Sequence, residues 1–259
     1  MTEEQFEEGY FTFKQFRVKQ KESAMKVGTD AVLLGSWMTL PTNTVSRLLD
    51  IGTGTGVISL LVAQRLSLIQ ENFDILAVEP DLPSFREAVF NFTESSWNER
   101  ICAVNDTFQH WAVGICADSF DCIFSNPPYF VNSLPAPDHR RSSARHADML
   151  PFDEITRHSI RLLKPGGTLS VILPPEESRT FSKSARGCFY DDKTLVPSRI
   201  CHVHPSPGKP VKRCIMEFIC KKNHPVNSPL PEAEVLILQD GFSLRSAQYS
   251  DLTKMFYVR

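Results

Sequence analysis

Short apolar runs alternate with segments of helical periodicity from residue 46 to residue 186, and this alternation constrains the fold more than any other feature of the sequence. The apolar runs that predict strands lie at 46–52, 73–80, 100–106, 120–124 and 168–174. The helical patterns lie at 57–66, 84–92, 151–163 and 176–186. Chains of this kind place their strands in parallel and cover both faces of the sheet with helices. We therefore predict an α/β fold with a doubly wound, mostly parallel sheet.

The pattern changes after residue 186. The apolar segments "SRICHVH" (198–204) and "VKRCIMEFICKK" (211–222) are separated only by "PSPGKP". Because this connection is too short for a helical crossover, the two strands must be antiparallel. We expect a sheet of seven strands that ends in an antiparallel hairpin.

The chain of 259 residues fits a single domain with three parts. Residues 1–45 form an N-terminal extension of β and helical character, 46–222 form the core, and 223–259 form a tail that packs on the core. Within the core, the predicted helix at 84–92 carries Phe85, Ala88, Val89 and Phe92 on one face, which we expect to be buried.

Two elements are expected in the N-terminal extension. Residues 11–18 alternate, but their apolar phase shifts, which predicts two short strand pieces joined by a bulge or turn. The segment "GTDAVLLGSW" (28–37) predicts a helix capped by Thr29 or Asp30 after a permissive Gly28.

Composition narrows the class of protein. Hydrophobic residues make up 42% of the chain and charged residues 22%, which is ordinary for a globular protein. No run approaches the ~18 apolar residues of a membrane span, and the acidic start "MTEEQFEEGY" does not resemble a signal peptide. The seven cysteines are odd in number and form no Cys-x-x-Cys. We expect reduced cysteines in a cytoplasmic protein, no structural metal and no membrane partner, and the oligomeric state stays open.

Basic residues gather in three segments, although the net charge of the whole chain is −2. The segments lie at 13–26, 139–146 and 199–222, and together they could line a surface for a polyanion. Solvated surface charge is the alternative interpretation of each segment alone. The candidate contacts to a polyanion are Lys14, Arg17, Arg140, Arg141, Arg145, Lys212 and Arg213.

A glycine-rich loop follows the first core strand. In "LLDIGTGTG" (48–56), Asp50 is followed by Gly52, Gly54 and Gly56 at alternate positions before a helix begins. Glycines allow the backbone to approach a ligand closely, and ligands of α/β sheets lie beyond the carboxyl ends of the strands. The spacing differs from the Gly-x-Gly-x-x-Gly of dinucleotide folds. It resembles the cofactor loop of class I S-adenosylmethionine methyltransferases, and a glycine-rich turn of some other α/β protein is the alternative.

Two acids follow the next strands. Glu79 ends the second strand, where a carboxylate can accept hydrogen bonds from both ribose hydroxyls of a nucleoside. Asp106 follows the third strand, where class I methyltransferases place a group that faces the adenine amino nitrogen. Each acid alone is equally consistent with a helix cap or a surface acid. In the same class the methionine carboxylate contacts a segment before the first core strand, which makes Lys26 and Thr29 candidates.

The fourth strand ends in Asn126-Pro127-Pro128-Tyr129. This tetrapeptide resembles the signature of methyltransferases that act on planar nitrogens, namely adenine N6, cytosine N4 and glutamine N5. The resemblance implies that the Asn126 side-chain oxygen and the Pro127 carbonyl orient the amine, while the prolines hold both acceptors stiffly. Tyr129 would stack on a base swung out of its strand or loop. A proline turn with a packing tyrosine is the alternative.

The N-terminal block is the most specific feature. Met25–Asp30 and Leu33–Trp37 resemble the Met-Lys-Val-Gly-Thr-Asp and Leu-Leu-Gly-x-Trp blocks of the bacterial valine-tRNA (adenine-N6) methyltransferase family. The resemblance continues through "LLDIGTGTGVISLL", "SNPPYF", "RHADMLPF" and "YSDLTKMFYVR", and so covers essentially the full length. It implies a Rossmann-like class I fold, S-adenosylmethionine as cofactor, and N6-methylation of the adenosine 3′ of the anticodon, position 37. The basic segments would then grip phosphates of the anticodon stem-loop.

Other planar amines remain alternatives. Glutamine-N5 methyltransferases of release factors carry an N-terminal helical domain, but only about 45 residues precede the first core strand here. DNA adenine-N6 enzymes need a target-reading domain, for which neither an insertion nor the tail offers room. Ribosomal RNA methyltransferases that act on guanine N2 or adenine N6 also remain. An RNA-binding module without turnover is a different class, against which the intact Asp50, Glu79 and Asn126 argue.

Overall fold

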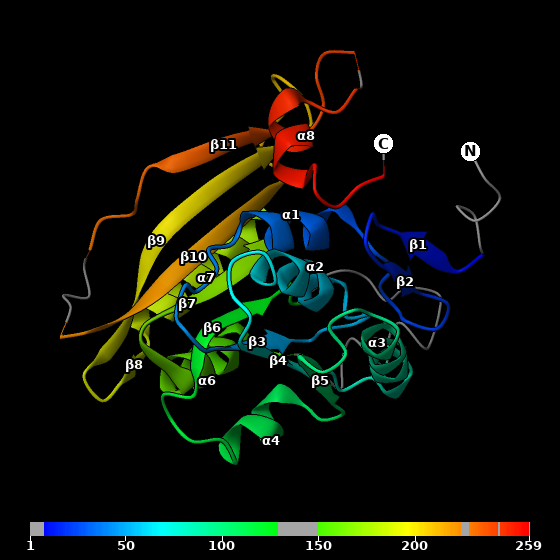
Figure 1. Ribbon diagram of the computed structural model, residues 1–259. Coiled ribbons are helices and arrows are strands. Elements are labelled where there is room, and N and C mark those ends of the chain that lie inside the picture. The colour runs from blue at the N-terminus through cyan, green and yellow to red at the C-terminus, as the bar shows by residue number, and fades with distance from the viewer. Residues whose placement is uncertain (1–7, 129–149, 224–227, 243, 259) are drawn as a thin grey trace, which may run out of the picture.

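A nine-stranded sheet forms the centre of the computed structural model, which describes residues 8–128, 150–223, 228–242 and 244–258 (Figure 1). Its order is β11-β9-β10-β7-β6-β3-β4-β5, with β8 beside β9. The strands are β3 (Ser46–Ile51), β4 (Phe73–Val78), β5 (Ile101–Val104), β6 (Phe120–Ser125), β7 (Leu163–Leu173), β8 (Phe189–Tyr190), β9 (Lys193–His204), β10 (Arg213–Lys222) and β11 (Ala233–Ile237).

The pairing confirms the predicted fold class. Strands β5, β4, β3, β6 and β7 pair in parallel, while β10 is antiparallel to both β7 and β9. Among the described residues, the central sheet contains two strands more than the seven expected. The strand β8 has only two residues, and β11 is a short edge strand that follows a proline-rich segment. Neither leaves a clear alternation in the sequence.

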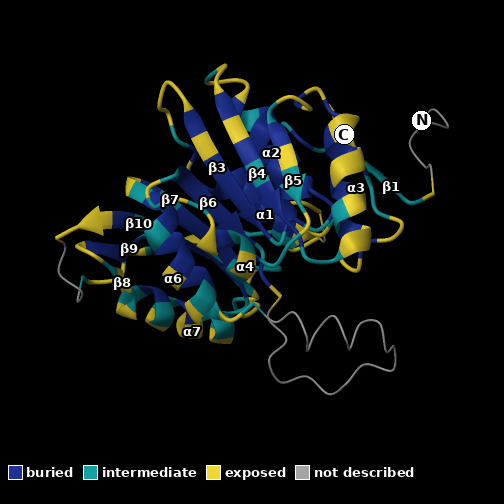
Figure 2. Ribbon diagram, turned by 90° about the horizontal axis from the view of Figure 1, so that it is seen from below, coloured by how far each residue is buried: buried dark blue, intermediate teal, exposed yellow. Residues whose placement is uncertain are grey.

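Helices cover both faces of this sheet (Figure 2). They are α1 (Thr29–Trp37), α2 (Val57–Leu66), α3 (Leu82–Thr93), α4 (Phe108–Val113), α6 (Phe152–Leu162), α7 (Pro175–Gly187) and α8 (Ala247–Thr253). Alternate residues of β3 enter different cores: Leu48 packs with Leu61 of α2, whereas Leu49 packs in the cluster that contains Phe181 of α7. The period of two along a buried strand therefore supplies both faces with apolar side chains.

Helix α1 is buried nearly all round. Its residues from Ala31 to Trp37 are all buried, which is typical of a helix packed inside a protein. The expected side-chain cap is wrong: Gly28 is the N-cap residue and makes no side-chain cap. The Asp30 carboxylate instead accepts a hydrogen bond from Arg213 Nε at 2.7 Å, which ties the first turn of α1 to the start of β10.

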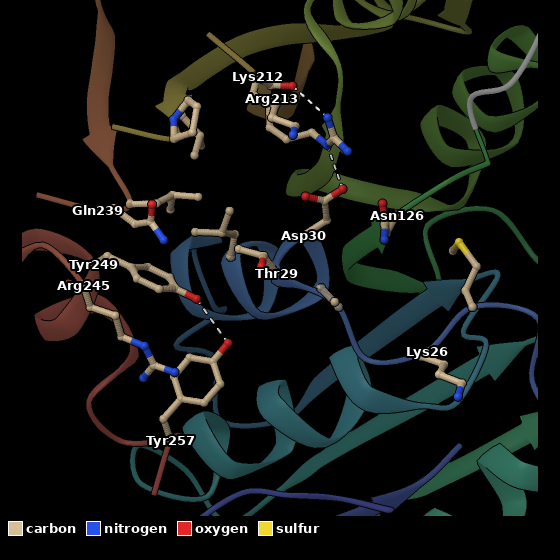
Figure 3. Close-up of a pocket in the computed structure, with 17 residues that line it drawn as sticks. Lys26, Thr29, Asp30, Asn126, Lys212, Arg213, Gln239, Arg245, Tyr249 and Tyr257 are labelled. Carbon is tan, nitrogen blue, oxygen red and sulfur yellow. Dashed lines mark hydrogen bonds and ion pairs between the residues drawn. The ribbon is translucent and has the colours of Figure 1, made fainter. Parts of the chain in front are cut away.

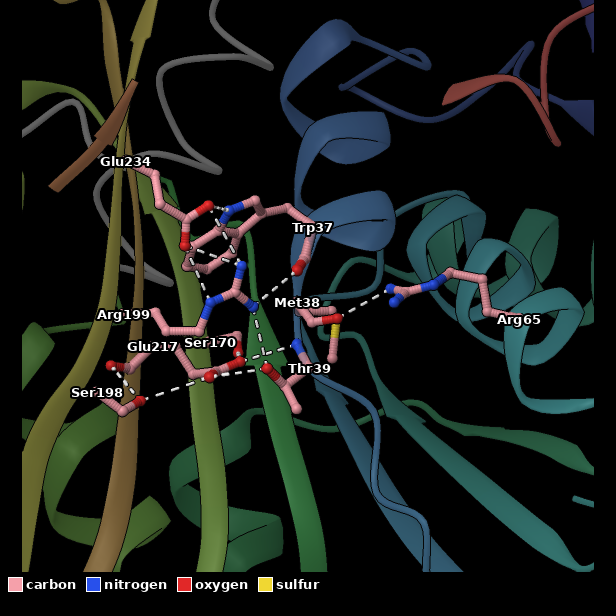
Figure 4. A network of polar contacts seen from close by, with 9 residues as sticks. All are labelled: Trp37, Met38, Thr39, Arg65, Ser170, Ser198, Arg199, Glu217 and Glu234. Carbon is pink, nitrogen blue, oxygen red and sulfur yellow. Dashed lines mark hydrogen bonds and ion pairs between the residues drawn. The ribbon is translucent and has the colours of Figure 1, made fainter. Parts of the chain in front are cut away.

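A polar network fastens the other end of α1 to the antiparallel hairpin (Figure 4). The Arg199 guanidinium lies 3.9 Å from the Trp37 ring centroid and pairs with Glu234, which also accepts a hydrogen bond from Trp37 Nε1. Arg65 donates to the carbonyl groups of Gly35 and Met38. The last carbonyl groups of a helix have no hydrogen-bond partner within the helix, so Arg65 acts as the C-terminal cap of α1. Arg199, from the third basic segment, thus has a structural role.

The two ends of the chain pack against each other. The strands β1 (Tyr10–Thr12) and β2 (Arg17–Lys19) pair antiparallel, which confirms the two short strand pieces. The turn between them binds the C-terminal tail, since the Lys14 N–H donates to the Phe256 carbonyl at 2.8 Å. The Phe13 ring stacks near Tyr257 with centroids 5.9 Å apart. Phe256 itself is fully buried.

Three chemical properties of the described residues bear on function. No helix among them has the length and apolar character needed to cross a membrane. All seven cysteines are free thiols. Within the described ranges, no three His, Cys, Asp or Glu side chains gather closely enough to hold a metal ion.

Candidate active site

Four candidate segments meet at one edge of the sheet. They follow β3, β4, β5 and β6, which are neighbouring parallel strands. Because parallel strands end at the same edge, the glycine loop, Glu79, Asp106 and Asn126 all lie there. The sequence predicted this convergence from the order of the strand ends alone.

The glycines of the loop differ in what they face. Gly52, Gly54 and Gly56 all have positive φ, at 69°, 58° and 82°. A Cβ atom on Gly52 or Gly54 would meet nothing within 4 Å, whereas a Cβ on Gly56 would lie 2.4 Å from the Phe92 ring. Gly52 and Gly54 therefore leave open space above the loop, and Gly56 allows the loop to pack closely on α3.

Asp50 supports this loop from inside the protein. Its side chain is fully buried, and Oδ2 accepts hydrogen bonds from Thr53 Oγ1 at 2.6 Å and Ser59 Oγ at 2.7 Å. Burial raises the pKa of Asp50 to about 6. Its other oxygen, Oδ1, is buried without a hydrogen-bond partner. In this conformation Asp50 fixes the shape of the loop through Thr53 and the first turn of α2.

Glu79 lies beside the open part of the loop. Its Oε2 accepts a hydrogen bond from the Gly54 N–H at 2.8 Å, and Oε1 accepts one from the Asp81 N–H at 3.0 Å. Burial raises the pKa of Glu79 to about 7, although both hydrogen bonds act to lower it. A carboxylate held at the mouth of a glycine loop is suited to bind a ligand with hydroxyl groups.

Asp106 is partly engaged by the helix that follows it, α4. Its Oδ1 accepts from the Thr107 N–H at 2.8 Å, and Oδ2 pairs with His110 Nδ1 at 2.6 Å. Thr107 is the N-cap residue of α4 and His110 lies in its first turn; the sequence does not predict this helix, because its six residues show no clear period. Contact between Asp106 and an adenine stays a prediction.

Asn126 presents an unusual polar atom at the end of β6. Its Oδ1 is buried and has no hydrogen-bond partner. The following Pro127 is buried and Pro128 is exposed, whereas Tyr129 lies outside the described residues. An unpaired buried acceptor costs about 1–3 kcal/mol. Seven described side-chain atoms are buried without a partner, and of these only Asn126 Oδ1 belongs to a residue that lines the cavity described next, so a ligand there can supply its donor.

Asn126 lines a cavity of about 630 Å³ (Figure 3). The walls come from the start of α1, the end of β6, the β9–β10 connection, the β11–α8 segment and the C-terminal tail. Lys26 and Thr29, the candidates for the methionine carboxylate, both line this cavity. A cavity of this size is in the range of small-molecule and cofactor sites.

The candidate RNA contacts fall into three groups. Lys212 and Arg213 line the cavity, and Arg213 is tied to Asp30. Lys14 and Arg17 lie on the N-terminal hairpin, where Lys14 Nζ donates to the Lys254 carbonyl and the Arg17 guanidinium lies 4.8 Å from the Tyr10 ring centroid. The remaining candidates, Arg140, Arg141 and Arg145, lie outside the described residues.

Two polar residues of α3 that were not predicted as site residues, Glu87 and Asn91, also organise the site. Glu87 accepts hydrogen bonds from the backbone N–H groups of residues 21–23, at 2.6 to 2.9 Å. Asn91 accepts from the Lys19 N–H and donates to the carbonyls of Lys19 and Thr55. These contacts link the N-terminal extension to the glycine loop. The signal in the sequence was the spacing of four positions between these two polar residues, which places them on the same face of the helix.

Comparisons with known proteins give one consistent result. The family model of the methyltransferase small domain matches residues 23–178. A Bacteroides fragilis protein named tRNA1(Val) (adenine(37)-N6)-methyltransferase is 38% identical over 250 residues, which cover 96% of this chain and 98% of that protein. A Flavobacterium johnsoniae protein of the same name is 36% identical over 249 residues, covering 96% and 99%. A solved Agrobacterium tumefaciens structure, described as a predicted O-methyltransferase, shares the fold with a TM-score of 0.63 at 19% identity, covering 88% and 96%.

Proposed function

The chain belongs to the tRNA1(Val) (adenine(37)-N6)-methyltransferase family, and we propose that it methylates N6 of adenosine 37 in a valine tRNA. It is an S-adenosylmethionine-dependent methyltransferase with a Rossmann-like α/β fold. The observation that carries the proposal is the buried, unpartnered Oδ1 of Asn126 in a cavity at the carboxyl edge of the sheet.

The strand ends fit S-adenosylmethionine. This group, when bound, supplies an electrophilic methyl group. The open space above Gly52 and Gly54 leaves room for a nucleoside, and the Glu79 carboxylate beside Gly54 is suited to accept its ribose hydroxyls. Lys26 and Thr29 would hold the methionine carboxylate, and Asp106 would face the adenine amino group. Asp50 acts on the cofactor indirectly, by holding the loop through Thr53 and Ser59.

Asn126 orients the target amine. The adenine amino group is a weak nucleophile because its lone pair is delocalised into the ring. The Asn126 Oδ1 accepts a hydrogen bond from one N–H of this amino group, and the Pro127 carbonyl accepts a hydrogen bond from the other N–H. With both N–H groups held, the nitrogen lone pair is directed toward the methyl group, and such fixed acceptors need little reorganisation during reaction.

The double proline and the aromatic ring complete the amine site. Pro127 and Pro128 fix the backbone of the turn after β6, because each proline ring locks φ. Tyr129 stacks on the adenine once the base has swung out of the anticodon loop. Methyl transfer to the amine needs neither a metal nor a strong base, since the surplus proton can leave the methylated nitrogen after transfer.

The substrate is held mainly through its phosphates. Lys212 is exposed at the cavity, and Lys14 and Arg17 extend the positive charge along the N-terminal hairpin. The arginines at 140, 141 and 145 would add to this surface. The seven cysteines are free thiols, which fits a protein that acts in the reducing cytoplasm, where tRNA is modified.

The test is methyl transfer from labelled S-adenosylmethionine to unmodified total tRNA, followed by nucleoside digestion and mass identification. We expect the labelled nucleoside to be N6-methyladenosine. We expect the label to map to position 37 of a valine tRNA. Label in ribosomal RNA, DNA or release-factor protein, with none in tRNA, would overturn the assignment in favour of another planar amine.

A matched pair of variants shows whether Asn126 carries the reaction. Asn126→Ala removes the acceptor, and we expect transfer to fall by about 10²- to 10³-fold. Asn98→Ala, at an exposed asparagine beyond α3, should transfer at the wild-type rate. Equal activity of the two variants would remove Asn126 from the mechanism.

A further inference from the structure

An arginine and two tyrosines form an ordered cluster on the C-terminal tail. The Arg245 guanidinium lies 4.0 Å from the Tyr257 ring centroid and 5.9 Å from that of Tyr249. The two hydroxyl groups are 3.1 Å apart, and the rings meet edge to face with centroids at 6.3 Å. Tyr257 is also held by Phe13, whose ring is stacked at 5.9 Å. The ring under the guanidinium is therefore fixed from several sides.

Arg245 has unused binding capacity. Its side chain is exposed, and among the described residues it makes no hydrogen bond or ion pair; only the ring contacts hold it. With its Cζ 4.0 Å from the Tyr257 centroid, the guanidinium contacts that ring on one side, and its exposed side and N–H donors remain available. A planar group held in place in this way loses little conformational entropy when a second plane stacks on it.

The cluster and Asn126 line the same cavity. Figure 3 shows Arg245, Tyr249 and Tyr257 on one side and Asn126 on the opposite side, with Thr29 and Asp30 between them. A volume of about 630 Å³ suits a drug-sized molecule, which is larger than one nucleobase. An adenine at Asn126 and a methionine carboxylate at Lys26 and Thr29 would still leave the Arg245 side of the cavity for another part of the RNA.

The polar groups around Arg245 suit a nucleotide. Gln239, on the same side in Figure 3, carries an exposed amide that can donate and accept, as a base edge requires. Lys212 is exposed on the cavity wall and can hold a phosphate. Arg213 is tied to Asp30, so it contributes less to phosphate binding.

We propose that the Arg245 side of this cavity is a second nucleotide subsite, in which a base next to the target adenosine stacks on the Arg245 guanidinium. The inference rests on the proposed function, because it needs an RNA substrate. Unpaired RNA bases commonly stack on arginine planes, and a cation on an aromatic ring adds a further attraction. The subsite holds the neighbouring nucleotide while the target base turns toward Asn126.

The experiment measures the affinity of a fluorescent valine-tRNA anticodon stem-loop, intact or with one abasic nucleotide on the 5′ or the 3′ side of position 37. For the wild-type protein, we expect one of the two abasic RNAs to bind about tenfold more weakly than the intact RNA. Arg245→Ala should bind the intact RNA about tenfold more weakly, with no further loss on that abasic RNA. Such non-additivity is the mark of a direct contact.

Two further variants separate stacking from other effects. Arg245→Lys keeps the charge but lacks the plane, so it should behave like Arg245→Ala. Arg86→Ala, at an exposed arginine of α3 outside the cavity, should keep the wild-type preference for intact RNA. Wild-type affinity in the lysine variant would assign Arg245 to a phosphate and overturn the stacking subsite.

A purely structural role has a different signature. If Arg245 only anchors the tail to Tyr257, then Arg245→Ala lowers the midpoint of thermal unfolding but still binds the abasic RNA more weakly than the intact RNA. That result would overturn the subsite. Methyl transfer to the intact stem-loop is measured in parallel. Binding with abasic discrimination but no transfer contradicts the proposed function alone, whereas transfer without discrimination contradicts the subsite alone.

Discussion

At the residue scale, several buried groups at the strand ends carry an energetic cost, and Asn126 and Glu79 are two of them. The Asn126 Oδ1 has no donor, and burial lifts the pKa of Glu79 to about 7. Sites that bind ligands often keep such unfavourable groups, because the ligand supplies the missing partner. The sequence singled out both residues as candidates, since each directly follows a strand. The engagement of Asp106 by His110 was not, because it depends on the unexpected helix α4.

The raised pKa of Glu79 makes stability depend on pH in a defined direction. Its pKa is about 7 in the folded protein and 4.5 ordinarily, so the folded state binds the proton more tightly. The stability from this proton is fully present below pH 4.5 and is lost as the pH rises through about 7. From pH 5 to pH 8 the free energy of unfolding of the wild type should therefore fall relative to Glu79→Gln, by about 2–3 kcal/mol. Denaturant titrations at the two pH values measure the difference.

Glu94→Gln, at an exposed acid just after α3, is the control for Glu79→Gln. It should follow the wild type at both pH values. Glu79→Gln should also bind S-adenosylmethionine at least tenfold more weakly by calorimetry, because a carboxylate is the stronger acceptor for hydroxyl groups. Identical pH dependence in the wild type and Glu79→Gln would contradict the assigned burial.

At the element scale, helix α3 serves as a clamp as well as a packing unit. The sequence predicted a buried face of Phe85, Ala88, Val89 and Phe92. Phe85 is only half-buried and Val89 is 39% exposed, whereas the polar residues Glu87 and Asn91 are buried. The prediction from apolar periodicity failed here because part of the buried face of α3 carries polar side chains, which bind backbone groups of the N-terminal extension. Such contacts join segments more than 60 residues apart and leave no local pattern.

Glu87→Gln should release the N-terminal extension. Burial alone would raise the pKa of Glu87, but hydrogen bonds from residues 21–23 outweigh it and lower the pKa below its ordinary value. The carboxylate is thus a favoured acceptor whose contribution is present above pH 4.5 and lost as the pH falls below it. We expect the amide hydrogens of residues 21–23 to exchange at least tenfold faster in the variant at pH 7.

The matched control for Glu87→Gln is Arg86→Gln, a neighbouring exposed side chain of the same helix. It should leave the exchange rates of residues 21–23 unchanged. Exchange is measured by mass spectrometry. Unchanged protection of these amides in Glu87→Gln would show that Glu87 does not hold residues 21–23 in place.

At the scale of the whole molecule, the mostly parallel sheet and its terminal antiparallel hairpin followed from the sequence, because buried strands and helices carry distinct periods. The joining of the two chain ends did not follow. The N-terminal hairpin, α1 and the tail come together around Phe13, Phe256 and Tyr257, and these contacts span nearly the full chain. They also build the cavity wall opposite Asn126.

Removal of the buried ring of Phe256 should therefore loosen both ends at once. Phe256 is fully buried, and Phe256→Ala should lower the free energy of unfolding by about 3–5 kcal/mol. Val258→Ala, at a residue that is 41% exposed, should change it by less than about 0.5 kcal/mol. Denaturant unfolding of the two variants provides the comparison, and equal stability would contradict the packing of the tail.

The measurement that tests the central claim most directly is the single-turnover rate of methyl transfer to the valine-tRNA anticodon stem-loop, for the wild type and Asn126→Ala, at saturating S-adenosylmethionine and RNA. The buried Oδ1 predicts a rate about 10²- to 10³-fold lower in the variant, with unchanged affinity for S-adenosylmethionine. An unchanged rate would contradict the claim that Asn126 orients the amine, and a rate lowered only in proportion to cofactor affinity would assign Asn126 to cofactor binding instead.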